Sequence, residues 1–411
     1  MTLIQQKSAP PLDTDDHRPP ALLRLLTAAG GPRYATALVV DAIGGGLLRP
    51  FMLLYGVGVL HLDAGAVGLA LSAGMVAGLL GVPLTGRWID RGARTLPAAV
   101  SLALRGAGAL TLLAAGSLPL FTVASVLFGI GSQSWPTTHG AVVATLTEGR
   151  LRDAALAAGR SLRNAGMGAG ALLATVAVAG GTDALRVLAG VTGATCLVSA
   201  LLVASLRVRA PQRPAAEAAS ESGEPLERLG LLSLANIPYA FCFDVLEVAL
   251  PALLVLQLHV SAAWSSGIFV GNTVLVIALQ LPLVLRLAKH PRRSVLTAAG
   301  AVLAASYLGF WAAGSLGGVP GAVAVALVAV PYTLGEILYT GSGTALIAAT
   351  APPHLLGRAL ARWEFSSGIG RAAAPAALTA VLTAAPDLGW PALALATGLA
   401  ALAVRRLAPQ A

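Results

Sequence analysis

Long apolar runs recur from one end of this chain to the other, and they leave few folds open to it. Each run has about 20 residues or more, the length that an α-helix needs to cross the hydrocarbon core of a bilayer. Of the 411 residues, 56% are hydrophobic and only 11% are charged, a composition too apolar for a water-soluble protein of this length. Because backbone polar groups in lipid need partners within the protein, the runs are predicted to be transmembrane helices.

About twelve spans are predicted from these runs, which makes the chain an all-α, multi-pass integral membrane protein. Their approximate ranges are 34–60, 64–85, 95–115, 118–146, 157–179, 185–206, 229–256, 262–287, 294–313, 318–345, 358–382 and 390–404.

Two stretches outside the spans differ in composition from the rest of the chain. Residues 1–33 hold several prolines and aspartates but no basic start leading into an apolar core, so they are predicted to be a cytoplasmic tail and not a signal peptide. Residues 207–229 are rich in alanine, glutamate, serine and proline, cannot bury a core, and are predicted to be a cytoplasmic linker. The expected domains are therefore six-helix bundles at 34–206 and 230–405, with a short tail at 406–411.

Basic residues are concentrated in the loops after even-numbered spans, whereas the loops after odd-numbered spans hold almost none beyond Arg186. By the positive-inside rule, the even loops and both termini are predicted to lie in the cytoplasm, with the protein in the cytoplasmic membrane. The net charge of +9 thus reports topology, and nucleic acid is not an expected partner. The basic residues of the even loops are Arg87, Arg91, Arg94, Arg150, Arg152, Arg207, Arg209, Arg213, Arg228, Arg286, Lys289, Arg292, Arg293 and Arg358.

The two halves of the chain resemble each other in sequence. LLGVPLTGRWIDRGAR in the first half matches ALQLPLVLRLAKHPRR in the second, which aligns Pro83 with Pro282 and Arg87 with Arg286. GRSLRNAGMG likewise matches ARWEFSSGIG. Parallel repeats of six spans, related by an axis along the membrane normal, are a common plan of membrane transporters.

A charged turn, GVPLTGRWIDRGAR, separates the second and third spans. Its Gly86, Asp90, Arg91 and Arg94 resemble the loop signature of the major facilitator superfamily, which reads glycine, three residues, aspartate, a basic residue, any residue, glycine and a basic residue. Here the second glycine comes one place early, at Gly92. The resemblance implies two pseudo-symmetric six-helix bundles, with this turn acting as a gating loop.

The resemblance also implies partners for the gating loop. It places Asp90 near the start of the eleventh span, around Gly357, where a carboxylate is stabilised by the positive end of the helix dipole. The two arginines of the turn are then expected to pair with Glu148 or Asp153 from the loop after the fourth span.

Several spans contain polar or charged residues, although a charge at the bilayer centre costs about 2.5–3.5 kcal/mol on insertion scales. The resemblance implies that the first, fourth, seventh and tenth spans line a central cavity, and these residues are concentrated on the same four spans, with Glu364 and Arg371 on the eleventh. Tyr332, Glu336 and Tyr339 also share one helical face. The candidates for proton coupling and the substrate cavity are Asp41, Arg49, Gln133, Asn236, Asp244, Glu247, Tyr332, Glu336 and Tyr339.

Each candidate has a structural alternative. Asp41 and Glu336 either take part in transport or form structural ion pairs, and Asp244 and Glu247 are open to the same two interpretations. Asp41 is the predicted coupling residue, with Arg49 two turns on as its intermittent partner.

Other polar residues of the spans are expected to be structural. His139 is expected to be a core histidine, and Arg105 to extend its side chain toward the cytoplasmic headgroups. Arg160, Arg163 and Arg362 are placed near the cytoplasmic ends of their spans, where helix-end pairing or an inner gate would explain them.

These features together predict a monomeric secondary transporter that uses protons to export a small, partly apolar molecule. A proton-coupled importer of a small metabolite is the alternative, and a membrane sensor that binds a ligand without moving it is a third possibility. No GxxxxGK[ST] loop for ATP is found. The six histidines are scattered, so no enzyme activity, cofactor or metal site is expected.

Overall fold

A computed structural model describes residues 27, 30–178, 181, 183–209, 224–261, 263–384 and 386–409. Within these ranges all regular structure is helical, apart from an isolated β-bridge between Ala93 and Arg209. Residues 1–26 and 210–223, which hold most of the predicted tail and linker, lie outside the described residues. The predicted all-α fold is confirmed.

The first half of the chain contains a broken first helix and five long ones. Asp63 caps the first long helix after the break, since its carboxylate accepts a hydrogen bond from Ala66 N at 2.9 Å. That helix ends at a turn in which Gly92 has φ of +97°, a conformation that glycine adopts without strain. The elements are α2 (Gly31–Leu48), η1 (Arg49–Phe51), α3 (Met52–Leu54), η2 (Tyr55–Val59), α4 (Ala64–Asp90), α5 (Thr95–Ala114), α6 (Leu118–Leu146), α7 (Gly149–Val178) and α8 (Ala184–Ala204).

The second half follows the same plan, and its first helix is again broken. The elements are α10 (Glu224–Ala240), α11 (Cys242–Asp244), η3 (Val245–Ala249), η4 (Ala252–Gln257), α12 (Ala263–Leu287), α13 (Arg292–Gly314), α14 (Gly318–Thr350), α15 (Leu356–Ala384) and α16 (Pro386–Leu407).

The broken first helices end in the same way in both halves. Each finishes in a π-helical segment, η2 or η4, and each is followed by a histidine in the left-handed region, His61 with φ of 53° and His259 with φ of 54°. This matched pair of irregular helix ends is a backbone counterpart of the sequence repeat.

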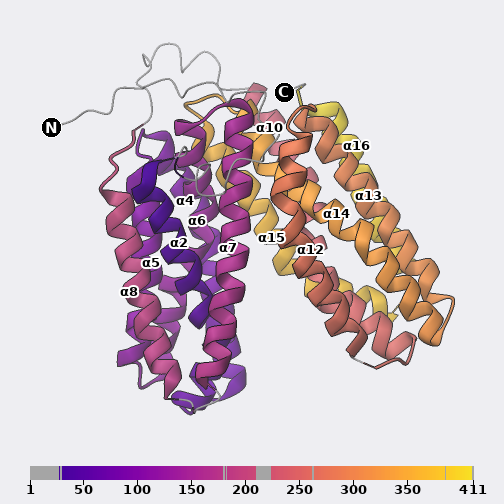
Figure 1. Ribbon diagram of the computed structural model, residues 1–411, viewed down its shortest axis with the longest axis horizontal. Helices are drawn as coiled ribbons and strands as arrows, with labels where there is room; N and C mark the ends of the chain where they lie inside the picture. The colour runs from indigo at the N-terminus through magenta and orange to yellow at the C-terminus, as the bar shows by residue number, and fades with distance from the viewer. Residues whose placement is uncertain are drawn as a thin grey trace.

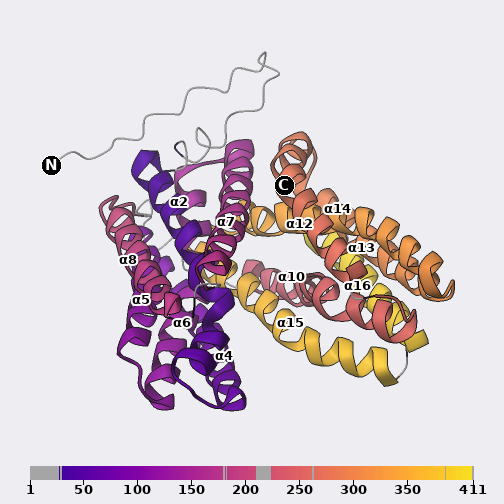
Figure 2. The same cartoon turned by 60° about the horizontal axis from the view of Figure 1, so that its bottom comes forward.

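The helices form two groups that lie side by side (Figures 1 and 2). In the first group α6 packs against α4 and α5, and α2 packs against α7 and α8. In the second, α13 packs against α14 and α16, and α10 against α15 and α16. The groups touch mainly through α4 with α15 and α7 with α12. In Figure 1 they converge at the end of the molecule where α16 terminates, called here the closed end, and diverge toward the other end.

Nine of the described helices are long and apolar enough to cross a membrane, and a tenth span results if the bent pair Gly31–Leu48 and Met52–Val59 counts as one. α7 and α15 are outside this set because of their charged residues, although their 30 and 29 residues extend about 44–45 Å as helices. The total of twelve spans therefore stays a prediction.

The outer surfaces of the two groups are apolar. Leu69, Val176 and Leu201 expose 74%, 76% and 72% of their surface, whereas Asn236 and Thr137 are completely buried. This distribution is the one expected of a protein surrounded by lipid tails, in which polar side chains face the interior.

Candidate functional site

The closed end is built on a crossing of two glycines. A Cβ atom on Gly357 of α15 would lie 2.3 Å from the backbone oxygen of Gly86 of α4, and one on Gly86 would lie 2.7 Å from the oxygen of Gly357. Such distances exclude any side chain, so the two backbones touch directly. This contact brings the end of α4 to the start of α15.

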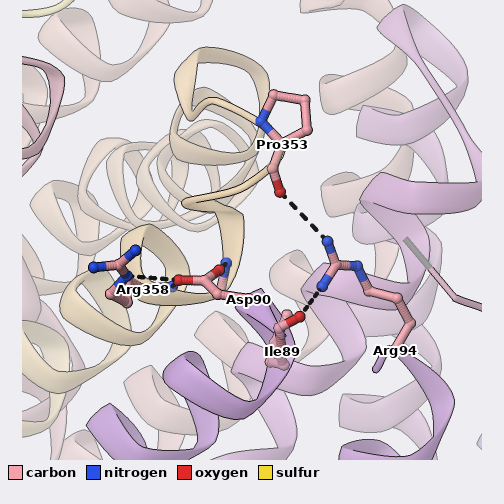
Figure 3. A network of polar contacts seen from close by, with 6 residues as sticks. Ile89, Asp90, Arg94, Pro353 and Arg358 are labelled. Carbon is pink, nitrogen blue, oxygen red and sulfur yellow. Dashed lines mark hydrogen bonds and ion pairs between the residues drawn. The ribbon is translucent and has the colours of Figure 1, made fainter. Parts of the chain in front are cut away.

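Asp90 uses that contact to bind the start of α15 (Figure 3). Its carboxylate accepts hydrogen bonds from Gly357 N at 2.7 Å and from Arg358 N at 3.3 Å, and it forms an ion pair with Arg358 Nε at 2.7 Å. The first backbone N–H groups of a helix lack helical partners and carry its positive dipole end. The expected position of Asp90 near Gly357 is confirmed.

Arg94 binds oxygens other than the carboxylates expected for it. Its guanidinium donates to Thr145 Oγ1 at 2.9 Å. It also donates to Pro353 O at 3.4 Å and to Ile89 O (Figure 3). Burial lowers the pKa of Arg94. The predicted pairing with Glu148 or Asp153 is therefore wrong for this residue, and Arg91 is exposed.

Asp153 instead contributes to a second ion pair across the closed end. Arg292 of α13 donates through Nε at 2.9 Å and through Nη2 at 2.8 Å to its carboxylate. Beside it, Arg152 Nη1 donates to Ala348 O at 3.0 Å. Asp153 therefore pairs with Arg292 and not, as predicted, with the arginines of the gating loop. Polar contacts of this kind join the two halves at the closed end.

A cavity of about 410 Å³ lies between the two groups of helices. Five of the nine predicted candidates line it, and these are Asp41, Arg49, Gln133, Glu336 and Tyr339. The remaining four, Asn236, Asp244, Glu247 and Tyr332, are not among its lining residues.

Asp41 forms a buried ion pair with Arg105 of α5. Arg105 Nη1 lies 2.7 Å from Asp41 Oδ1, and the two side chains expose 9% and 6% of their surface. Arg105 therefore does not extend toward the headgroups as expected, and it replaces Arg49 as the partner of Asp41. Asp41 and Arg105 each lie ten residues beyond the start of their helices, and this equal depth was a sequence indication of the pair.

Glu336 lies at the cavity with an amide as its side-chain partner. Asn272 Nδ2 donates to Glu336 Oε2 at 3.0 Å and also lies 3.0 Å from Thr333 Oγ1. In the part of the chain that the structure describes, no cationic side chain is within 4.0 Å of this carboxylate. Glu336 is thus a cavity carboxyl without a counter-ion.

Asn236 connects helices of the second half. Its Nδ2 donates to Ser366 Oγ at 2.9 Å and to Ser367 Oγ at 2.8 Å, and its Oδ1 accepts from the hydroxyl of Tyr339 at 2.8 Å. Asn236 is fully buried, so these contacts tie α10 to α14 and α15.

The other C-terminal candidates have separate surroundings. Tyr332 is fully buried and donates to Cys242 O, so the expectation that it shares the cavity face is wrong. Asp244 is half-buried and Glu247 is exposed.

His139 is held among aromatic rings. The hydroxyl of Tyr34 lies 2.8 Å from its Nδ1, and the rings of Tyr34 and Trp135 stack on it with centroids 6.0 and 5.7 Å away. The predicted hydrogen-bond partner of His139 is present, but the residue is half-buried and lines the cavity, so it is not a pure core histidine. Among the described residues, no three His, Cys, Asp or Glu side chains converge as ligands of a metal would.

The charged residues of α7 and α15 were not among the predicted candidates for the cavity. Arg160 and Arg163 of α7 and Glu364 and Arg371 of α15 all line it. The arginines of α7 were placed near a helix end because the predicted span began at residue 157. α7 begins at Gly149, so they lie about 16–21 Å along its axis.

Comparison with known proteins identifies the family. The sequence profile of the Major Facilitator Superfamily matches residues 34–375. The chain belongs to the Major Facilitator Superfamily. Among proteins of curated function, no sequence matches significantly.

Several solved structures of the superfamily are similar to this chain. The human organic anion transporter MFSD10 is 17% identical, with a TM-score of 0.68, over 94% of this chain and 100% of that one. FucP in its outward conformation is 15% identical, with a TM-score of 0.73, over 94% and 98%. The proton:xylose symporter XylE is 14% identical, with a TM-score of 0.72, over 96% and 97%. At these identities the likeness establishes the fold, which is that of a membrane transporter.

Proposed function

We propose that this protein is a secondary active transporter that exports a small, partly apolar molecule across the cytoplasmic membrane in exchange for protons. One observation carries the proposal: a cavity lined by charged side chains lies between two groups of helices that converge toward one end (Figure 1). Charges are costly at membrane depth and are kept there for a purpose. A cavity between two pseudo-symmetric halves suits alternating access, in which the halves rock about a central site.

The basic loops assign the two ends of the molecule. Arg87, Arg91, Arg94 and Arg292 lie at the closed end, so the positive-inside rule makes that end cytoplasmic. The diverging end then faces outward, and the closed-end contacts of Asp90 would have to break before the cavity opens inward. This is the role that we propose for the gating loop of Gly86, Asp90, Arg91 and Arg94.

Glu336 is the proposed proton-coupling residue. Its ionised form has no cation close by, so it is stable while the cavity is wet and unfavourable once the cavity closes and water leaves. A proton removes that cost, and it can be taken up on one side and released on the other. The groups around Glu336 are Asn272 of α12, Thr333 of α14 and, farther off, Glu247 of η3. Asp41, the residue favoured by sequence, is the weaker candidate because Arg105 already balances its charge.

The test combines a screen with a reconstitution. Cells that lack their own exporters are screened for resistance and for uptake, and the substrate so found is followed in proteoliposomes with and without a pH gradient. Glu336→Gln is expected to abolish accumulation driven by the gradient while exchange without a gradient continues. Asp183→Asn, at an exposed position outside the cavity, is the control and should accumulate substrate normally. Full accumulation by Glu336→Gln would remove this residue from the coupling mechanism.

A proton-coupled importer is the second candidate, and one observation favours it. The cavity is lined by more arginines than carboxylates, and a proton on Glu336 would add to that positive charge. A bound proton and a bound anion attract each other, so they would travel together, and an inward proton gradient would drive uptake. The orientation of accumulation in the proteoliposomes distinguishes import from export.

A further inference from the structure

The charges that line the cavity do not balance. Arg49, Arg160, Arg163 and Arg371 line it, against the carboxylates of Asp41, Glu336 and Glu364. Asp41 is already paired with Arg105, which is not a lining residue. The four arginines therefore face two carboxylates.

None of the four arginines has an ion-pair partner among the residues whose side chains the structure describes. No carboxylate oxygen lies within 4.0 Å of any of them. Arg163 and Arg371 repel Arg49, and Arg371 repels Arg163, whereas Asp41 and Glu364 attract Arg163. The guanidinium carbon of Arg371 lies 5.3 Å from the ring centre of Phe243, a cation–π contact that keeps this arginine at the cavity wall.

This arrangement is tolerable only while water or a counter-ion fills the cavity. Like charges that approach in a medium of low dielectric repel strongly, and alternating access requires the cavity to close around its cargo. A bound anion removes that cost, because each guanidinium can donate two parallel hydrogen bonds to a carboxylate, sulfonate or phosphate group.

The rest of the wall is part polar, with Gln133, Asn164 and Ser367 among its residues, and part apolar. Leu79 and Val82 of α4, Phe243, and Ile337 of α14 also line the cavity. A ligand that fits both parts of the wall has an anionic head and an apolar body.

We propose that the transported molecule is a small amphiphilic organic anion whose acidic group is bound by Arg49, Arg163 and Arg371. This inference rests on the proposed function for the use of the cavity, and it adds the substrate class. The apolar body of the anion lies against α4 and Phe243.

The test measures binding and does not depend on transport. The full chain is placed in lipid nanodiscs and titrated with three anions of one size, 1-naphthoate, 1-naphthalenesulfonate and 1-naphthyl phosphate. The uncharged comparison is 1-naphthamide, and the cationic one is 1-naphthylmethylammonium. At least one anion is expected to bind ten times more tightly than the amide or more, and the cation more weakly than either.

Variants locate the binding to the arginines. Arg163→Gln and Arg371→Gln are each expected to weaken anion binding at least tenfold without a comparable effect on the amide. Arg405→Gln, on an exposed arginine in the last turn of α16, is the matched control and should bind as the unaltered chain does. Thermal unfolding midpoints verify that each variant is folded, and the comparison of anion with amide on the unaltered chain needs no variant.

The possible results separate this inference from the proposed function. Equal binding of amide and anion, preference for the cation, or failure of all three anions to bind would overturn the substrate class. Anion binding that depends on the arginines, without movement of the bound anion in proteoliposomes, would contradict the transport proposal and leave the anion site standing.

Discussion

Replacing Asp90 with asparagine is the sharpest test of the gating loop. The substitution keeps the shape of the side chain but removes its charge and one of its two acceptor oxygens. In the structure those oxygens hold Gly357 N and Arg358 Nε, both at 2.7 Å. Asparagine can keep one of these contacts as a hydrogen bond accepted by its uncharged oxygen. At the other contact its NH₂ group faces a second donor, so that hydrogen bond is lost.

The expected loss follows from these contacts. A hydrogen bond to a charged group contributes about 1.5–3 kcal/mol. The Arg358 side chain is 42% exposed, so its ion pair adds only about 0–1 kcal/mol. We therefore expect the closed end to lose about 2 kcal/mol in total, which is about thirty-fold in the equilibrium between its closed and open forms.

Spin labels on the two halves can follow that equilibrium. Arg87 and Lys289 are exposed, lie near the closed end in different halves and make none of its described contacts. Replaced by labelled cysteines, they report the distance between the halves, and native Cys196 and Cys242 are buried. Asp90→Asn is expected to shift the population toward longer distances and to slow turnover, while substrate affinity stays within a few fold.

Asp63→Asn is the matched control. Asp63 caps the opposite end of the same helix, α4, by accepting a hydrogen bond from Ala66 N. Its substitution by asparagine should leave the label distances unchanged. The reasoning is refuted if Asp90→Asn leaves both distances and turnover normal, or if substrate affinity collapses while bound substrate moves at its usual rate.

Three further outcomes are expected. Gly357→Ala places a methyl group 2.3 Å from a backbone oxygen of α4, so the same label pair should report a closed end that cannot form; an unchanged distance would contradict the glycine crossing. Asp41→Asn leaves Arg105 buried and unpaired, which should cost about 3–5 kcal/mol of stability and lower the unfolding midpoint in detergent. Adding Arg105→Gln to this variant should restore much of the lost stability. An Asp41→Asn variant as stable as the parent would show the ion pair to be dispensable. Reporters fused after Arg94 should behave as cytoplasmic and those after Val260 as external, and the reverse pattern would invert the assignment of the two ends.

The helices and the position of Asp90 could be predicted, and for different reasons. The apolar runs are long and carry few charges, so they indicate helices without reference to packing. Asp90 came from the resemblance of the gating loop, because the partner of a loop residue cannot be read from its own segment. The cavity face of α14 was predicted only in part, since periodicity correctly placed Glu336 and Tyr339 there but could not tell that Tyr332 turns into the core of its own half.

The charge balance of the cavity was missed because it depends on tertiary structure. Arg160 and Arg163 lie on a helix that begins earlier than its apolar part, so hydropathy alone set them too close to the surface. The removal of Asp41 from that balance depends on Arg105, which comes from a different helix. The equal depth of Asp41 and Arg105 in their helices could have indicated the pair. That indication is usable only when the two helices are known to be neighbours.

The ion pairs of the closed end have a fixed polarity. Asp90 and Asp153 belong to the first half, and their partners Arg358 and Arg292 belong to the second. The sequence repeat aligns Asp90 with Lys289, so the sign of the charge is reversed at this one pair of equivalent positions. Each ion pair needs an acid from the first half and an arginine from the second, so two copies of one half can form neither of them. Expressed as separate polypeptides, the two halves are therefore expected to bind each other, because only the mixed assembly restores these ion pairs.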